Sequence, residues 1–265
     1  MNKPAACFFL VSGLFACRLA LAQESLDRDL SIKPLAPQIF VVTHAYPWPS
    51  NSVVAFMEDR RVLLIDTPYT PEATERVLAW IANRSPSSKL VAVNTHFHID
   101  RLGGNAALVR HGIPIYGGNL TVKAIRERGK SSIEGIIGWV KDEKIRAYFR
   151  GFTSVEPTRI FDSKAGLDLK FGSETALLRF PGEGHSVDNL LVFLPKWGLL
   201  FGGCMLLAAE ANKPGNVADG DQAAWLKSMR GLKTDGIKLV VPGHGEPGGV
   251  GLVSHTIEVL SAPAM

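Results

Sequence analysis

The sequence predicts one α/β domain whose β-sheets lie inside and whose helices lie outside. Hydrophobic residues make up 46% of the 265 residues and charged residues 20%, a globular composition that excludes disorder, collagen-like repeats and coiled coil. Short apolar runs rich in β-branched residues are followed by helical patterns twice along the chain. Two strand–helix halves that pack together as one domain are the architecture expected from this order.

In the first half, turn residues and one helix start predict the elements. After a polar stretch that precedes residue 39, the segment Pro47–Asn51 is expected to be a turn between strands. Thr70 is placed to cap a helix, and Pro71 would occupy its first position. The expected strands are 39–43, 53–57, 62–65, 90–93 and 113–116, and the expected helices are 70–84 and 103–111.

The second half contains a long polar segment with a helical period. Within residues 119–150, Ile133, Ile136, Ile137 and Val140 fall on one helical face. This predicts a surface helix that buries one apolar stripe. Further strands are expected at 167–171, 176–180, 190–194, 199–201 and 238–241, and further helices at 222–232 and 251–260.

The first 22 residues have the pattern of a secretory signal peptide. Lys3 gives a basic start, an apolar stretch runs to Cys17, and Ala20-Leu21-Ala22 is a small-x-small cleavage site. Lipoprotein processing at Cys17 is the alternative, but Phe15 stands where that signal requires a small residue. We therefore expect cleavage after Ala22, a mature domain of residues 23–265 and a periplasmic location.

Charge and hydropathy argue against nucleic-acid and membrane partners. The chain carries 29 Lys and Arg residues against 25 Asp and Glu, a net charge of +4, and loss of Lys3 and Arg18 with the leader leaves +2. This balance is too weak for a nucleic-acid surface, and no apolar run reaches the ~18 residues of a membrane span. Because no segment marks a subunit interface, a monomer is expected.

Residues that commonly bind metals follow four apolar strands and are flanked by glycines. Side chains two positions apart in an extended segment share one face, and neighbouring glycines leave room for an ion and a substrate. Cys204, the one cysteine outside the leader, cannot form an internal disulfide and is therefore either inert or held by a metal. The set comprises His96, His98, Asp100, His185, Cys204 and His244. The isolated His44, His111 and His255 are interpreted as ordinary core or surface residues.

Imidazole, thiolate and carboxylate ligands together favour zinc over calcium or magnesium. Six ligands exceed the four of a closed structural site, and a catalytic zinc keeps an open position where it lowers the pKa of bound water to about 7. The sequence therefore predicts metal-assisted hydrolysis with two Zn²⁺ ions per chain. We assign the first ion to His96, His98 and His185, and the second to Asp100, Cys204 and His244.

The motifs around these residues resemble those of metallo-β-lactamases of subclass B1. The resemblance implies an αββα sandwich of two mixed β-sheets with helices on both outer faces. It also implies a dinuclear zinc site and hydrolysis of penicillins, cephalosporins and carbapenems, which gives antibiotic resistance. The short connection at 44–50 and the helical segment at 119–150 resemble a minority of the subclass. The matching segments are His96-Phe97-His98-Ile99-Asp100-Arg101, Gly184-His185-Ser186-Val187-Asp188-Asn189, Gly202-Gly203-Cys204-Met205 and Pro242-Gly243-His244-Gly245.

Three positions favour the two-zinc lactamase over its relatives. Arg101 and Cys204 stand where glyoxalase-II-like and nuclease-like members of the superfamily carry His and a bridging Asp. His96 stands where the subclass with one working zinc usually carries Asn. The alternatives are another zinc hydrolase, acting on a thioester, lactone or phosphodiester, and a non-catalytic zinc-binding periplasmic protein.

The resemblance also implies roles toward a small-molecule β-lactam. Asn216 lies where the family's Asn helps polarise the lactam carbonyl, and Asp100 would orient the attacking water and carry its proton. The family commonly has Lys three residues after Cys204, but this chain has Leu207 there. Lys213 is the nearest cation in sequence and is expected to pair with the substrate carboxylate instead.

Overall fold

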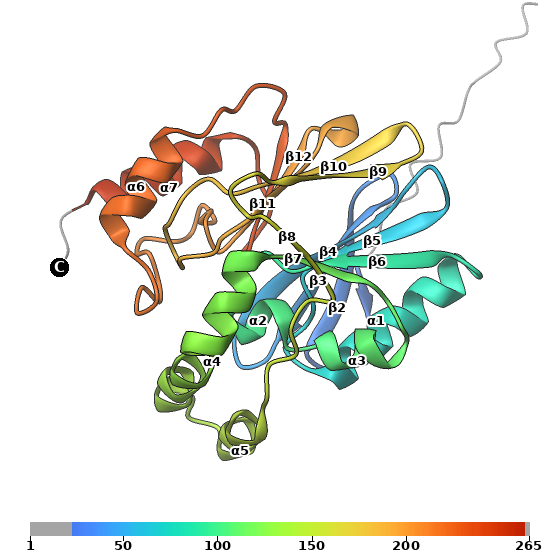
Figure 1. The fold of residues 1–265 in the computed structure, drawn as a ribbon, viewed down its shortest axis with the longest axis horizontal. Coiled ribbons are helices and arrows are strands. Elements are labelled where there is room, and N and C mark those ends of the chain that lie inside the picture. The colour runs from blue at the N-terminus through green and yellow to red at the C-terminus, as the bar shows by residue number, and fades with distance from the viewer. Residues whose placement is uncertain (1–22, 263–265) are drawn as a thin grey trace, which may run out of the picture.

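The computed structural model describes residues 23–262, and it contains two β-sheets between outer helices (Figure 1). Parallel pairing occurs in both sheets, so both are mixed. In spatial order, the first sheet contains β1 (Glu24–Ser25), β2 (Leu30–Ala36), β3 (Ile39–Ala45), β4 (Pro49–Phe56), β5 (Arg61–Ile65), β6 (Lys89–Val93), β7 (Ile115–Gly118) and β8 (Arg159–Phe161). The second contains β13 (Leu239–Pro242), β12 (Leu199–Gly203), β11 (Leu191–Leu194), β10 (Glu174–Arg179) and β9 (Leu167–Phe171).

Seven α-helices and one short 3₁₀ turn, Pro195–Trp197, complete the described chain. The α-helices are α1 (Pro71–Arg84), α2 (Ile99–Leu102), α3 (Asn105–Arg110), α4 (Asn119–Trp139), α5 (Glu143–Gly151), α6 (Gln222–Arg230) and α7 (Gly251–Ser261). In Figure 1, α6 and α7 lie on one side of the two sheets, α1 and α3 lie on the other, and α4 and α5 project from the molecule. The predicted αββα sandwich is therefore confirmed.

Three apolar layers hold the sandwich together. Between the sheets, fully buried side chains such as Leu63 and Phe201 pack against one another. Trp80 of α1 packs on the outer face of the first sheet, and Trp225 of α6 packs on the outer face of the second. Burial of an aliphatic or aromatic side chain of this size contributes ~1.5–3 kcal/mol, so these layers dominate folding. They place the ends of β6, β10, β12 and β13 at one common edge.

Most predicted elements appear within a few residues of their expected bounds. The start of α1 is confirmed in detail, since the Thr70 hydroxyl accepts the Ala73 N–H at 3.1 Å and Pro71 is the first helical residue. The segment 119–150 forms two helices rather than one, because Asp142 caps a second start. Its apolar stripe packs against Tyr69 and Phe149, as predicted for a helix with one buried face.

Several elements were wrong or missed in the sequence prediction. The polar stretch before residue 39 is largely β2, where Leu30 and Ile32 are buried, and Pro34 had obscured this alternation. Pro49–Asn51 belongs to β4 rather than to a turn, because it pairs with the end of β3. The short α2 and β8 carry too few residues to show a period.

The predicted signal peptide, residues 1–22, lies outside the described residues. Among residues 23–262, no helix has the length and apolar character needed to cross a membrane. The three histidines interpreted as ordinary residues make ordinary contacts. His44 is buried and its Nδ1 accepts the Tyr69 N–H at 3.2 Å, His111 pairs with Glu75, and His255 contacts a backbone carbonyl.

Candidate metal centre

The structure brings all six predicted metal ligands together at the shared edge of the two sheets. His96 and His98 follow β6, and Asp100 lies in the first turn of α2. His185 lies in the loop after β10, while Cys204 and His244 directly follow β12 and the end of β13. All are buried except His244, whose side chain is half-exposed.

Three imidazole nitrogens converge to form a first candidate site. Nδ1 of His98 lies 3.2 Å from Nε2 of His96 and 3.1 Å from Nε2 of His185. Two ligand nitrogens at ~2.1 Å from one tetrahedral zinc would be about 3.4 Å apart, so these separations suit a shared ion.

The remaining three ligands form a second cluster beside the first. Oδ2 of Asp100 lies 3.2 Å from Nε2 of His244 and 3.7 Å from Sγ of Cys204, and Sγ lies 3.5 Å from the same His244 nitrogen. Ligand atoms of His96, Asp100 and Cys204 also lie within 4.8 Å of one another. The two clusters therefore lie side by side and can bind two neighbouring ions.

Two glycines allow the backbone segments to approach this closely. Gly203 has φ 51°, a left-handed conformation that turns the chain into Cys204. Its carbonyl accepts the Gly243 N–H at 2.7 Å, which joins the loops after β12 and β13. A Cβ on Gly243 would lie 2.7 Å from Nη2 of Arg101, so only glycine fits there.

Arg101 is a fully buried cation beneath the second cluster, and the sequence interpretation had used it only to separate subfamilies. Its Nη2 lies 2.6 Å from Oδ2 of Asp100, 3.3 Å from Sγ of Cys204 and 3.3 Å from Nε2 of His244. On its other side, Nη1 lies 3.7 Å from Asp66. This guanidinium balances the negative ligands that would otherwise be buried without a partner.

Electrostatics keep four of the six ligands in forms that bind metals, whereas Cys204 and Asp100 together raise the pKa of His244 to about 10 in spite of burial. Burial lowers the pKa of His185 to about 4 and holds the pKa of His96 well below its ordinary value, so both rings are neutral. Burial would raise the pKa of the Cys204 thiol, but Arg101 and the neighbouring histidines together outweigh burial and lower that pKa to about 5. In spite of burial, Arg101 and His244 together also hold the pKa of Asp100 well below its usual range.

Asp219 orients His98, and sequence reasoning missed it because no local pattern marks this loop residue. Its Oδ2 lies 3.0 Å from Nε2 of His98, and this hydrogen bond raises the pKa of His98 against the effect of burial. The carboxylate accepts a hydrogen bond from the Nε2–H, which leaves the lone pair on Nδ1 facing His96 and His185. A single lone pair cannot satisfy both neighbouring nitrogens, whereas a cation between the three rings can. The residues present therefore fit a metal ion.

A cavity of about 540 Å³ opens onto both clusters. Asn216 lines it, and the Asn216 Oδ1 accepts the Ala218 N–H at 3.0 Å, which leaves the amide NH₂ group free. Lys213 lies on the exposed loop before Asn216 and is outside the residues that line the cavity. Leu207 packs against the layer between the second sheet and α7, and its N–H is bonded to Thr256.

Comparison with known proteins agrees with this geometry. The family model described as "Metallo-beta-lactamase superfamily" matches residues 45–244. The metallo-beta-lactamase type 2 of Bacteroides fragilis is 29% identical over 264 residues, which cover 96% of this chain and 95% of that protein. The metallo-beta-lactamase type 2 of Bacillus sp. (strain 170) is 31% identical over 214 residues, which cover 80% of this chain and 73% of that protein.

Solved structures show the same fold. A metallo-beta-lactamase from Pontibacter korlensis superimposes with a TM-score of 0.71 at 29% identity, and the match covers 87% of this chain and 98% of that chain. The αββα sandwich and the converging ligands are those of a metal-dependent hydrolase. The chain belongs to the metallo-beta-lactamase superfamily, and among the enzymes of that superfamily it is a class B β-lactamase.

Proposed function

We propose that this protein is a subclass B1 enzyme that uses two zinc ions to open the β-lactam ring of penicillins, cephalosporins and carbapenems. The observation that carries the proposal is the pair of adjacent ligand clusters at the floor of one cavity, a three-histidine cluster beside an Asp–Cys–His cluster. Family membership supplies the reaction class, and the cavity is of the size that binds small molecules. Hydrolysis of these drugs would give antibiotic resistance.

Zinc fits this donor set better than the other common ions. Imidazole and thiolate ligands disfavour calcium and magnesium, which prefer oxygen ligands. His96, His98 and His185 would hold the first ion, and Asp100, Cys204 and His244 the second. When bound, zinc supplies a water that ionises near neutral pH and positive charge for the lactam carbonyl.

The chain's own residues would position the reactants. Asp100 belongs to the second cluster and its carboxylate lies within 4.8 Å of a His96 nitrogen of the first, where it would orient the attacking water and hold its proton. Asn216 would donate its free amide N–H to the lactam carbonyl oxygen from the cavity wall. The low exposure of Asp100, His98 and His185 limits competing water, which strengthens each of these interactions.

The experiment measures zinc content per chain together with hydrolysis of a penicillin, a cephalosporin and a carbapenem. We expect two zinc ions, loss of hydrolysis on chelation with EDTA and recovery on addition of zinc. Clavulanate, which acts on serine enzymes, should have no effect. Hydrolysis that persists after measured removal of all metal would disprove the metal mechanism, and hydrolysis of only thioesters, lactones or phosphodiesters would disprove the substrate assignment.

We also propose export to the periplasm as a monomer. The basic start, apolar stretch and small-x-small site within residues 1–22 support cleavage after Ala22. Mass spectrometry of protein from a periplasmic fraction should give a mature chain that begins at Gln23, and gel filtration should give a mass near that of one chain. An intact N-terminus in the cytosolic fraction would contradict the export proposal.

A further inference from the structure

Two tryptophans border the cavity above the metal ligands, and the proposed mechanism does not use them. Trp48 lies between β3 and β4, and Trp139 is the last residue of α4. Both line the cavity together with the buried Tyr69 and the half-buried Ile136. The indoles come from segments about ninety residues apart and meet the same cavity, so the tertiary fold creates this apolar wall.

Both indoles are far more exposed than folding alone would favour. Trp139 is 59% exposed and Trp48 is 42% exposed, whereas Trp225 in the core is fully buried. A large aromatic side chain left in water contributes little to folding, and exposed apolar groups at the mouth of a cavity commonly bind ligands. Their exposure therefore points to an apolar ligand group.

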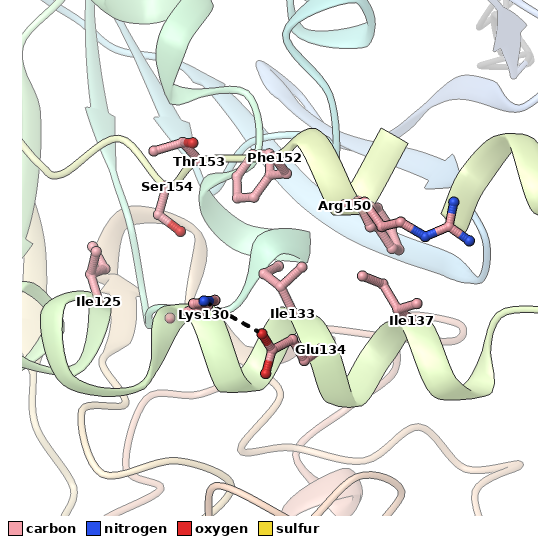
Figure 2. Close-up of a pocket in the computed structure, with 11 residues that line it drawn as sticks. Ile125, Lys130, Ile133, Glu134, Ile137, Arg150, Phe152, Thr153 and Ser154 are labelled. Carbon is pink, nitrogen blue, oxygen red and sulfur yellow. Dashed lines mark ion pairs between the residues drawn. The ribbon is translucent and has the colours of Figure 1, made fainter. Parts of the chain in front are cut away.

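The position of Trp139 is fixed by its neighbours rather than by its own burial. Val140, which follows it, is 4% exposed and packs with Phe149 in the cluster that holds α4 against α5. Figure 2 shows Ile133 and Ile137 on the side of α4 that faces the segment after α5, where they line a separate cavity. Ile136 and Trp139, three residues apart, line the metal cavity instead.

The cavity wall lacks lysine and arginine side chains. Among the described residues that line it, none is Lys or Arg, and the cationic Arg101 is buried below the ligands. A negatively charged substituent would find no lysine or arginine beside the two indoles, whereas a flat aromatic ring can stack on or contact the edge of an indole. The rigid Pro47-Trp48-Pro49 segment and the anchored end of α4 reduce the conformational entropy lost on binding.

We propose that Trp139 is a specificity-determining residue that binds the aromatic acyl side chain of the substrate, with Trp48 as the opposing wall. This inference rests on the proposed β-lactamase function. It assigns a preference for lactams with a planar aromatic substituent over lactams with the same ring system and no such substituent.

The test compares benzylpenicillin with 6-aminopenicillanic acid, which has the same lactam ring and carboxylate but lacks the phenylacetyl group. Trp139→Ala should raise KM for benzylpenicillin about tenfold and leave KM for 6-aminopenicillanic acid within about twofold. Trp139→Phe should retain most of the difference in KM between the two substrates that the unmodified enzyme shows. Ile160→Ala is the control, because Ile160 is 55% exposed and lies outside the cavity lining.

The outcomes separate this inference from the function on which it rests. If the unmodified enzyme hydrolyses neither penicillin, the proposed function is wrong. If it hydrolyses both and Trp139→Ala leaves both KM values unchanged, or raises them equally, the assignment of Trp139 is wrong. Circular dichroism and thermal unfolding of the variant check that the exposed substitution leaves the fold intact.

Discussion

Nε2 of His98 lies 3.0 Å from Oδ2 of Asp219, although 121 residues separate the two in the chain. The same ring presents Nδ1 to His96 and His185, so one carboxylate decides which nitrogen of His98 is available to a metal. Asp219 is only slightly exposed, with 13% of its side chain accessible, and this strengthens the hydrogen bond. The first metal site therefore depends on a loop that contributes none of its ligands.

Replacement of Asp219 tests this dependence. Asp219→Asn keeps the size of the side chain but removes the carboxylate that holds the His98 proton, so zinc affinity of the first site should fall about 10–100-fold. Competition with a chromophoric chelator measures that affinity. Asp235→Asn is the control, because Asp235 is exposed and outside both ligand clusters. Equal affinities in the two variants would show that Asp219 has no role in metal binding.

Cys204→Ser should weaken the second site and spare the first. A hydroxyl is a poor zinc ligand at neutral pH. In spite of burial, Arg101 and the neighbouring histidines together lower the pKa of Cys204 to about 5, which keeps its sulfur ionised. We expect about one zinc per chain, held by the three histidines, and strongly reduced turnover. Metal analysis after dialysis measures the number of zinc ions per chain. Retention of two zinc ions and full activity would contradict the assignment of Cys204 as a ligand.

Lys213→Ala tests the expected recognition of the substrate carboxylate. Loss of one solvent-exposed ion pair costs about 1 kcal/mol, so KM for benzylpenicillin should rise about fivefold while kcat changes little. Lys233→Ala provides a matched exposed lysine far from the cavity. Since Leu207 packs in an apolar layer, Leu207→Lys should destabilise the protein rather than restore binding. An unchanged KM in Lys213→Ala would mean that another group holds the carboxylate.

His44 gives a pH dependence of stability that does not involve the metal ligands. Burial lowers the pKa of His44 from 6.5 to about 4, against a smaller opposing effect of Asp29. Between pH 4 and 6.5, His44 binds a proton in the unfolded chain but not in the folded chain. The free energy of unfolding therefore falls as the pH drops from about 6.5 to 4. Over this pH range the free energy of unfolding falls by about 3 kcal/mol.

Chemical unfolding of zinc-loaded protein at pH 7 and pH 4.5 measures this effect. His44→Gln retains a hydrogen-bond acceptor for the Tyr69 N–H but does not titrate, so its stability should depend less steeply on pH. The other histidines are common to both proteins, and the difference between the two slopes isolates His44. Identical slopes would refute the prediction.

Local patterns in the sequence were sufficient for most elements and for the set of candidate metal ligands that the fold brings together. The start of α1 could be predicted because its signals lie within four residues: the Thr70 side chain accepts the Ala73 N–H, and Pro71 occupies the first helical position. The convergence of the six candidate ligands could be predicted because they stand in short glycine-flanked motifs after apolar strands, and strand ends meet at one edge. By contrast, β2 was missed because Pro34 interrupts its alternation, and only its pairing with β3 establishes it.

Only the tertiary structure decided which other residues serve the site. Asp219 reaches His98, and Arg101 reaches Cys204, through contacts between loops distant in sequence, and no local spacing encodes such contacts. The same holds for Trp139, whose place beside the cavity depends on how α4 packs on α5. The sequence by itself determined the ligand types, because coordination chemistry is a property of single side chains. Orientation, charge balance and the shape of the cavity are properties of packing, and they appear only once the two sheets and their loops have come together.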